Sequence, residues 1–331
     1  MDSFKKTVFS SIQPTSQLTL GNYIGSLSKW SSMQNSYNCI YCISDLHSMT
    51  IRNYSSSLQN RVFDTLALYL SCGIDPNKSI IFVQSYVKEH TELQWILNCY
   101  TYFGELMRMT QFKNKSMQNS SNINAGLLNY PILMASDILL YQSNIVPIGE
   151  DQIQHLELVS RIAKRFNKIY GKVFTIPNFL IPNCGSRIMS LLNPNKKMSK
   201  SDNNVNNVIF LLDDIKIIHN KIHKAVTDSD FPPRIIYNPI IKPGISNLLE
   251  IFSCITDKEI NYLENIFKGK SYCYFKKSLI NAITSKINKL QKKFYFYRRN
   301  EKYLKKIINS GANAAKIIAK KTLIKVFNAI N

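Results

Sequence analysis

Short apolar runs alternate with longer segments of mixed polarity through the first half of the chain. The apolar runs predict strands at 4–12, 39–43, 79–84 and 145–148. The longer segments predict helices at 21–34, 58–72, 90–112, 129–141 and from about 151 to 170. The strands are apolar almost throughout, which is typical of a parallel sheet covered on both faces. The pattern therefore predicts an α/β fold built on a parallel sheet.

Strand signals fade beyond residue 203. Helical patterns follow at 208–226, 246–255, 259–267 and 276–297, separated by clusters of Pro, Gly and Asn. We expect an α/β domain over 1–203 and a smaller all-helical domain over 204–297. A basic helical segment over 298–331 is expected to pack back on the first domain.

Composition adds a strong positive charge to this picture. The 331 residues are 45% hydrophobic and 11% aromatic, enough to fill a core, and the net charge is +21. Most of that charge follows Lys268, where 17 Lys and Arg face Glu301 as the one acidic residue. Such a surface suits nucleic acid or an anionic membrane. A general drift toward Asn, Ile and Lys in the composition is the alternative source of part of the charge.

Neither the start of the chain nor its cysteines indicate export. The first residues lack the apolar core of a signal peptide, and no apolar run approaches about 18 residues. We therefore expect a cytoplasmic protein without a membrane partner. Seven cysteines, an odd number, favour reduced thiols. Cys39 and Cys42 form a C-x-x-C inside a predicted strand, where they face opposite sides, so core thiols are favoured over a metal or redox site.

A lysine-rich loop is the first candidate for chemistry. Residues 196–201 read Lys-Lys-Met-Ser-Lys-Ser and follow the turn-forming pair Pro194-Asn195. No amphipathic period fits the segment, which predicts a mobile loop. Its ammonium groups, hydroxyls and amides suit phosphate groups. A solvated surface turn is the alternative.

The turn between the first strand and the first helix is the second candidate. In an open parallel sheet, ligands bind at the carboxyl ends of strands, notably in this turn. Helix-terminal amides there favour a phosphate, and Gln13, Thr19 and Asn22 can hydrogen-bond a nucleotide. An ordinary polar turn is the alternative.

The third candidate is a carboxylate in an apolar helix. With Pro131 at the first helical position, Tyr130, Met134 and Asp137 fall on one face. A buried Asp137 must find donors or a cation. It is either tied to neighbouring protein groups or waits at the bottom of an apolar pocket for a ligand N–H or O–H.

Two further polar groups follow predicted strands. The segment Gly149-Glu150-Asp151-Gln152 opens a helix, where its carboxylates also suit the helix dipole. Asp45-Leu46-His47 ends another strand and can line the same cleft, although His47 also suits a structural role.

Several of these segments occur together and in order. The strings are SSIQP (10–14), TLGNYIG (19–25), GEL (104–106), MTQFK (109–113), DILLY (137–141), VPIGEDQ (146–152), KMSKS (197–201) and AVTDS (225–229). Together they resemble the bacterial tryptophanyl-tRNA synthetases, members of the class I aminoacyl-tRNA synthetases, along nearly the whole chain. TLGN holds the place of the first class I signature and KMSKS that of the second.

The resemblance implies a catalytic Rossmann-like domain ending in the KMSKS loop, a helical anticodon-binding domain, and a homodimer in which each tRNA(Trp) spans both subunits. The implied substrates are L-tryptophan and ATP, with Mg²⁺ carried by the ATP and no metal bound by protein residues. The implied catalytic residues are Thr19, Asn22, Lys115, Lys197 and Lys200. The implied ATP-binding residues are Gln13, Pro14, Thr15, Gly21, Asn22, Gly149, Glu150, Asp151, Ile188, Lys197, Met198, Ser199, Lys200 and Ser201.

The same resemblance implies a tryptophan pocket. Asp137 would accept the indole N–H between walls from Phe9, Met134, Val146 and Ile148. Residues implied at the amino acid's polar end are His47, Gln111, Tyr130 and Gln152. Met134 argues against a tyrosyl-tRNA synthetase, which tends to place Gln there, and one carboxylate in an apolar wall suits the single donor of indole.

Two positions depart from the family. Ser11 and Ser16 stand where glycine is usual, so we expect them to crowd the adenylate or strain the turn and lower efficiency. A tyrosyl-tRNA synthetase-like ligase and a catalytically degenerate tRNA-binding relative are the alternatives.

Overall fold

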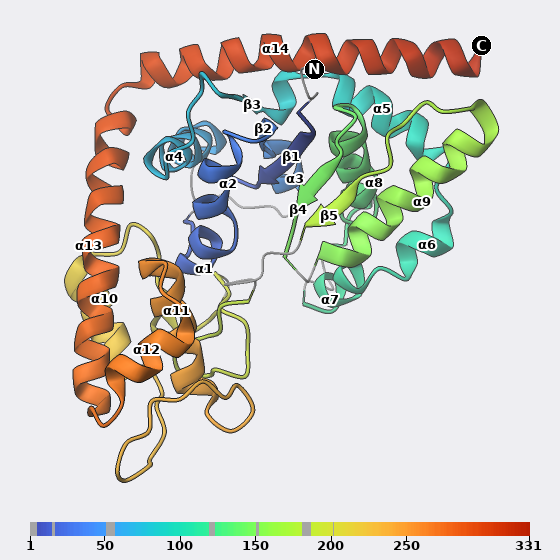
Figure 1. Ribbon diagram of the computed structural model, residues 1–331. Helices are drawn as coiled ribbons and strands as arrows, with labels where there is room; N and C mark the ends of the chain where they lie inside the picture. Colours follow the sequence, from blue (N-terminus) through green and yellow to red (C-terminus); the bar gives the residue numbers. More distant parts are fainter. Residues whose placement is uncertain are drawn as a thin grey trace.

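Five parallel strands form the centre of the computed structural model, in the order β3-β2-β1-β4-β5 (Figure 1). The structure describes residues 5–14, 17–50, 57–118, 123–149, 152–180, 187–200 and 202–331. The strands are β1 (Thr7–Ile12), β2 (Asn38–Ile43), β3 (Ser79–Val83), β4 (Ile145–Pro147) and β5 (Asn178–Leu180). Because β1 lies in the middle, the sheet grows outward from it in both directions, and the predicted Rossmann-like α/β fold is confirmed.

Helices cover both faces of this sheet. From β1 to β3 they are α1 (Leu20–Asn22), the π-helix η1 (Tyr23–Leu27), α2 (Ser28–Met33), α3 (Asp45–Ser48) and α4 (Leu58–Ser71). From β3 to β5 they are η2 (Gln84–Tyr86), α5 (Glu89–Asn98), α6 (Phe103–Met107), α7 (Thr110–Gln118), α8 (Ala125–Leu139) and α9 (Ile153–Tyr170). After β5 they are η5 (Val205–Asn207), α10 (Ile215–Lys224), α11 (Pro243–Thr256), α12 (Ile260–Phe267), α13 (Tyr272–Arg298) and α14 (Glu301–Ile330).

Successive strand residues enter different hydrophobic clusters, one on each face of the sheet. Val8 packs in the cluster that reaches α4 and α11–α13, whereas Phe9 packs in the cluster with α8 and α9. Cys39 and Cys42 divide in the same way, and both are buried and free. The prediction of core thiols on opposite faces of a strand is confirmed.

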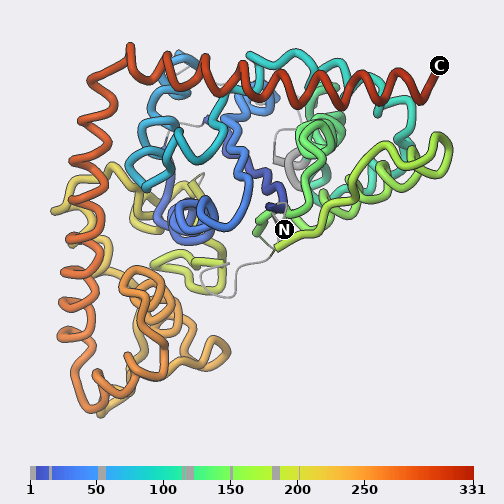
Figure 2. Tube along the Cα trace, turned by 45° about the horizontal axis from the view of Figure 1, so that its top comes forward, coloured from blue at the N-terminus to red at the C-terminus, as the bar shows by residue number. Residues whose placement is uncertain are grey.

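The final helix covers the open edge of the sheet. Figures 1 and 2 show α14 lying across the β3 side of the molecule, with α13 running away from it beside α10–α12. Gly311 meets β3 so closely that a Cβ there would lie 1.8 Å from the carbonyl oxygen of Ile81. Glycine therefore allows a helix to touch strand backbone and shield an edge that would otherwise expose unpaired groups.

Three sequence-based element predictions need correction. The helix expected at 90–112 is broken into α5, α6 and the start of α7, because Tyr102 is extended and caps α6. The helix expected at 129–141, with Pro131 in its first turn, begins at Ala125, since the Asn124 side chain accepts the Leu127 N–H. Pro131 therefore lies inside α8. Strand β5 was not predicted, because it is three residues long and exposed.

The helix predicted at 208–226 is also shorter, because its first residues pair with the chain next to α1. Leu20 N donates to Ile209 O at 2.8 Å, and Leu211 N donates to Leu18 O at 2.9 Å. Helix α10 then starts at Ile215, where Asp214 caps it. The first turn of the sheet domain is thus held by a segment from beyond residue 203.

None of the helices within these described ranges is both long and apolar enough to cross a membrane.

Candidate functional site

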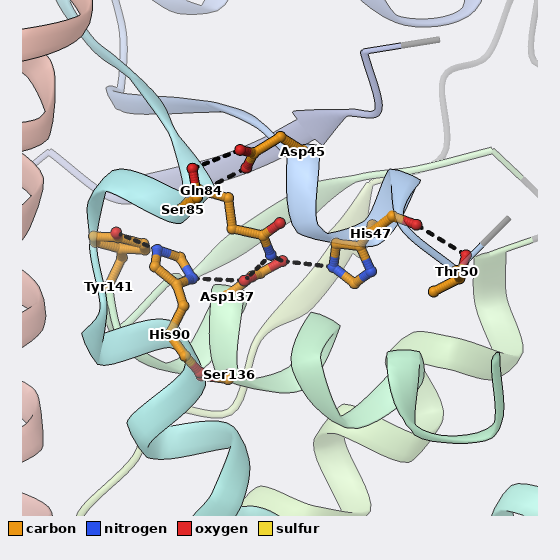
Figure 3. Close-up of polar contacts among 9 residues, drawn as sticks. All are labelled: Asp45, His47, Thr50, Gln84, Ser85, His90, Ser136, Asp137 and Tyr141. Atoms are coloured by element: carbon orange, nitrogen blue, oxygen red, sulfur yellow. Dashed lines mark hydrogen bonds and ion pairs between the residues drawn. The ribbon is translucent and has the colours of Figure 1, made fainter. Parts of the chain in front are cut away.

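Asp137 lies at the centre of a buried polar network under the carboxyl ends of β2 and β3 (Figure 3). Its side chain projects from α8 and the residue is only 1% exposed. His47 Nε2 lies 2.9 Å from Oδ2, and His90 Nδ1 lies 2.6 Å from Oδ1. Gln84 Nε2 donates to both oxygens, at 2.7 and 2.8 Å. The buried carboxylate is thus tied to three side chains from three other elements.

The network keeps this carboxylate ionised. Burial alone would raise the pKa of Asp137, but the charge and hydrogen bonds of His90 and His47 outweigh it and hold the pKa well below its usual value. The Gln84 amide turns its nitrogen to the carboxylate and leaves its buried Oε1 without a partner among the described groups. An orphaned buried acceptor costs about 1–3 kcal/mol, so a charged Asp137 must favour this orientation.

Four hydrogen-bond contacts fill the usual acceptor positions of a carboxylate. Gln84 supplies two of them from one nitrogen. It can therefore give up one contact to an incoming N–H and keep the other. The two interpretations of Asp137 made from the sequence are compatible, because the protein ties the carboxylate down and still leaves one position open to exchange.

The apolar residues expected to form the indole walls lie in one cluster. Phe9 of β1, Val146 of β4 and Ile148 just after β4 are buried in it, and the half-buried Met134 packs against it. Phe9 stacks on Tyr141 with centroids 5.5 Å apart. Val146 and Ile148 lie at the carboxyl end of β4, and Phe9 lies in the adjacent β1. The strand order reverses between these two strands, and open α/β sheets bind ligands at such a point.

Of the residues expected at the polar end of tryptophan, Tyr130 lies next to His47. The His47 ring lies edge-on to Tyr130, with centroids 6.3 Å apart. Tyr130 Oη also lies 2.7 Å from His155 Nε2. Gln152 is the residue before α9, and its backbone N–H donates to Gly149 O at 3.0 Å. Gln111 is half-buried in α7. In this structure His47 contacts Asp137 directly, a link that the sequence did not reveal.

In the first turn, Thr19 and Asn22 cap the helix that follows. Asn22 N donates to Thr19 Oγ1, and Asn22 Oδ1 accepts from Thr19 N at 3.0 Å. This capping box explains why TLGN starts a helix. Thr19 is buried and Asn22 exposed, while Gln13 is half-buried and Pro14 buried.

The lysine loop contacts that same turn. Met198 N donates to Ile188 O at 2.9 Å, and Lys197 pairs with Met189 in an isolated antiparallel β-bridge. A Cβ on Gly21 would lie 3.7 Å from Ile188 and 3.9 Å from the Met198 sulfur. The prediction of a wholly mobile loop is wrong at Met198, which is buried because its apolar side chain joins the core. Lys197, Ser199 and Lys200 are exposed around that anchor.

Some expected site residues cannot be placed. Thr15, Ser16, Glu150, Asp151 and Ser201 lie outside the described residues, as does the side chain of Lys115. Ser11 is described and lies in β1 opposite Cys42. Its φ is not positive, so it does not strain the backbone. Whether it crowds an adenylate stays a prediction.

Sequence reasoning missed Gln84, His90 and Tyr141. Gln84 follows β3 immediately, so the rule that polar residues at carboxyl ends of strands line a site could have found it. His90 and Tyr141 gave no such signal. They lie 51 residues apart in the chain, and only the fold brings His90 Nε2 to 2.8 Å from Tyr141 Oη.

Comparisons with known proteins show the family of this chain. Residues 3–327 match the family model of class I tRNA synthetases (W and Y). The chain is 56% identical to the tryptophan–tRNA ligase of Buchnera aphidicola from Schizaphis graminum, over 333 residues, covering 100% of this chain and 99% of that protein.

Two solved structures are similar over nearly their whole length. Tryptophanyl-tRNA synthetase from Mycoplasma pneumoniae superposes with a TM-score of 0.91 at 34% identity, covering 98% of this chain and 97% of the other. The Campylobacter jejuni enzyme complexed with ADP and tryptophan gives a TM-score of 0.80 at 31% identity, covering 98% and 99%.

Fold, site and sequence matches thus define a class I tRNA synthetase of the tryptophan and tyrosine group. Within that class, the chain belongs to the family of tryptophan–tRNA ligases.

Proposed function

We propose that this protein activates L-tryptophan with ATP to tryptophanyl-adenylate and pyrophosphate, and then transfers tryptophan to the 3′-terminal ribose of tRNA(Trp). The observation that carries this proposal is the ionised Asp137 carboxylate, buried beside an apolar cluster at the point where the strand order reverses. Indole offers a large apolar ring with one N–H donor, which suits such a pocket. The relative from Campylobacter jejuni was solved with ADP and tryptophan.

Activation needs no nucleophile from the protein, because the substrate carboxylate attacks the α-phosphorus in line. The chain's task is to position the two substrates and to neutralise charge growing on the departing pyrophosphate. We propose Lys197 and Lys200 for the second role, with Lys115 beside them. Mg²⁺ arrives with ATP and shields the phosphates.

For the nucleotide we propose the first turn and the segment after β4. Gln13, Pro14 and Thr15 would line the turn, and Gly21 and Asn22 would approach from the helix start. The exposed Asn22 can still turn its amide nitrogen to a nucleotide, since only its oxygen serves the capping box. Proposed contacts from elsewhere are Gly149, Glu150, Asp151 and Ile188, with Met198, Ser199 and Ser201 of the lysine loop.

For tryptophan we propose that Asp137 accepts the indole N–H between Phe9, Met134, Val146 and Ile148. Residues proposed at its polar end are His47, Gln111, Tyr130 and Gln152. The clustering of four walls around one face of α8 supports this arrangement.

We propose tRNA(Trp) and a second copy of the chain as the macromolecular partners, in the cytosol. The helices over 204–297 and the basic segment over 298–331 offer exposed lysines to RNA phosphates. Not all are available, because Lys276 donates to Ala225 O and Lys325 to Val173 O. Large exposed side chains on and before α5 and α6, among them Trp95 and Phe103, are the surface that a second copy could cover.

The decisive test is tryptophan-dependent exchange of radioactive pyrophosphate into ATP. We expect exchange with tryptophan and none with tyrosine. Exchange with tyrosine would identify a tyrosyl-type ligase. Retained tRNA binding without any exchange would identify a degenerate relative.

We expect Asp137→Asn to weaken tryptophan binding by about tenfold or more, because a hydrogen bond to a charged acceptor is worth about 1.5–3 kcal/mol. Gln84 can turn its unpartnered Oε1 toward the new amide, so the network can persist without the charge. Equilibrium dialysis with labelled tryptophan measures the effect, with ATP affinity as the internal control. Equal tryptophan affinity would show that the carboxylate is only structural.

A further inference from the structure

His90 is fixed on both its main chain and its ring by two adjacent residues of α8. Ser136 Oγ donates to the carbonyl oxygen of His90 at 2.6 Å, and Asp137 Oδ1 lies 2.6 Å from His90 Nδ1. His90 and Ser136 are completely buried. The first turn of α5 therefore places one imidazole against one carboxylate oxygen.

The far side of the ring meets Tyr141. His90 Nε2 lies 2.8 Å from Tyr141 Oη, and burial raises the pKa of Tyr141 well above its usual value, so the phenol keeps its proton. A neutral imidazole has one donor and one acceptor nitrogen. Because the ionised Asp137 carboxylate can only accept, Nδ1, the nitrogen that faces it, carries a proton whether the ring is charged or neutral, and in the neutral ring Tyr141 O–H donates to Nε2 (Figure 3).

Tyr141 also touches the wall of the proposed indole pocket. Its ring stacks on Phe9 with an interplanar angle of 9°. The Tyr141 side chain thus contacts the far nitrogen of the His90 ring and also backs an apolar wall. A buried chain of contacts runs from Asp137 through His90 and Tyr141 to Phe9. It joins the carboxylate that would bind the indole N–H to the wall that would pack on the indole ring.

We propose that His90 is a positioning residue for tryptophan recognition: backed by Tyr141, it fixes Asp137 so that the carboxylate meets the indole N–H. The proposal rests on the proposed function, in which Asp137 accepts that N–H. The bond from His90 holds Oδ1, which leaves Oδ2, shared by His47 and Gln84, as the oxygen whose contacts can exchange with a ligand. A well-aligned acceptor discriminates strongly only when its direction is fixed.

The test compares tryptophan with 3-benzothienyl-L-alanine, in which sulfur replaces the indole N–H with nearly the same shape. His90→Leu removes the donor to Asp137, whereas His90→Asn retains an amide donor near the position of Nδ1. Tyr141→Phe keeps the stacking on Phe9 and removes only the hydroxyl. Dissociation constants of both ligands are measured for each full-length variant.

We expect His90→Leu to lose about tenfold in tryptophan affinity and less than about threefold for the benzothienyl analogue, as loss of one charge-assisted hydrogen bond predicts. His90→Asn should recover most of the preference for tryptophan. Tyr141→Phe should lower that preference by about two- to fivefold. This milder variant tests the proposal even if His90→Leu does not fold.

Equal losses for both ligands in His90→Leu and Tyr141→Phe would overturn the proposal, because a purely structural role does not distinguish N–H from sulfur. So would an unchanged preference in both variants. The same measurements on the wild-type protein and on Asp137→Asn distinguish failure of the His90 proposal from failure of the proposed function. If the wild-type protein does not prefer tryptophan over the analogue, the role of Asp137 itself is wrong.

Discussion

Lys200→Ala is expected to lower kcat for tryptophan activation by about 100- to 1,000-fold, the usual cost of removing one group that stabilises transition-state charge. Lys200 is exposed next to the buried Met198, which anchors the loop against Gly21 and the first turn. A lysine there can reach phosphates at the helix start without being part of the tryptophan pocket. Tryptophan affinity should therefore stay within about twofold, since contacts made only in the transition state change kcat.

Pre-steady-state formation of the adenylate measures this effect, with equilibrium binding of tryptophan measured alongside. Lys216→Ala is the matched control, because it removes the same charge from an exposed position in α10. It should leave activation unchanged. Normal activation by Lys200→Ala would remove the loop lysine from the mechanism, and an equal loss in the control would point to overall charge instead.

Gly311→Ala should destabilise the protein by about 3 kcal/mol or more, at the upper end for an overpacked core site. The new Cβ would lie 1.8 Å from Ile81 O and 2.7 Å from Ile81 C, and both are backbone atoms that no rotamer change can move. Either α14 must lift from β3 or the strand must shift. Lifting α14 would expose the sheet edge and the buried Ala312, Ala315 and Ala319.

Urea denaturation followed by far-UV circular dichroism measures this loss as a lower midpoint. Gly104→Ala in α6 is the control, because its Cβ would meet nothing within 4 Å and its φ is not positive. It should stabilise the protein by about 0.4–1 kcal/mol through a less flexible unfolded chain. An unchanged midpoint for Gly311→Ala would mean that α14 does not press on β3 in solution.

The local signals of the sequence were sufficient for the sheet and for much of the candidate site. Continuous apolar runs predicted four of the five strands, and the positions of Cys39 and Cys42 predicted that both thiols are buried on opposite faces. Spacing on one helix predicted that Tyr130, Met134 and Asp137 share α8. These features depend on periodicity and composition, which are properties of neighbouring residues.

Local sequence signals were insufficient to place the starts of two helices, α8 and α10. The start of α8 depended on whether Asn124 or Pro131 determined the first turn, and the side-chain cap of Asn124 prevailed. The helical pattern after residue 207 predicted a helix correctly but placed its start too early, because backbone pairing with Leu18 and Leu20 keeps residues 208–211 out of the helix. Backbone pairing with a distant segment can override a local helical preference.

The sequence by itself determined the α/β class, the order of the motifs, and the residue types that we propose to meet tryptophan and phosphate. Only the tertiary structure decided what holds Asp137, because Gln84, His90 and Tyr141 lie far apart in the chain and converge on it only in the folded protein. The same holds for Gly311, whose neighbour is a strand more than two hundred residues earlier. A buried charge needs partners from every side, and the folded chain supplies them from whichever elements lie there.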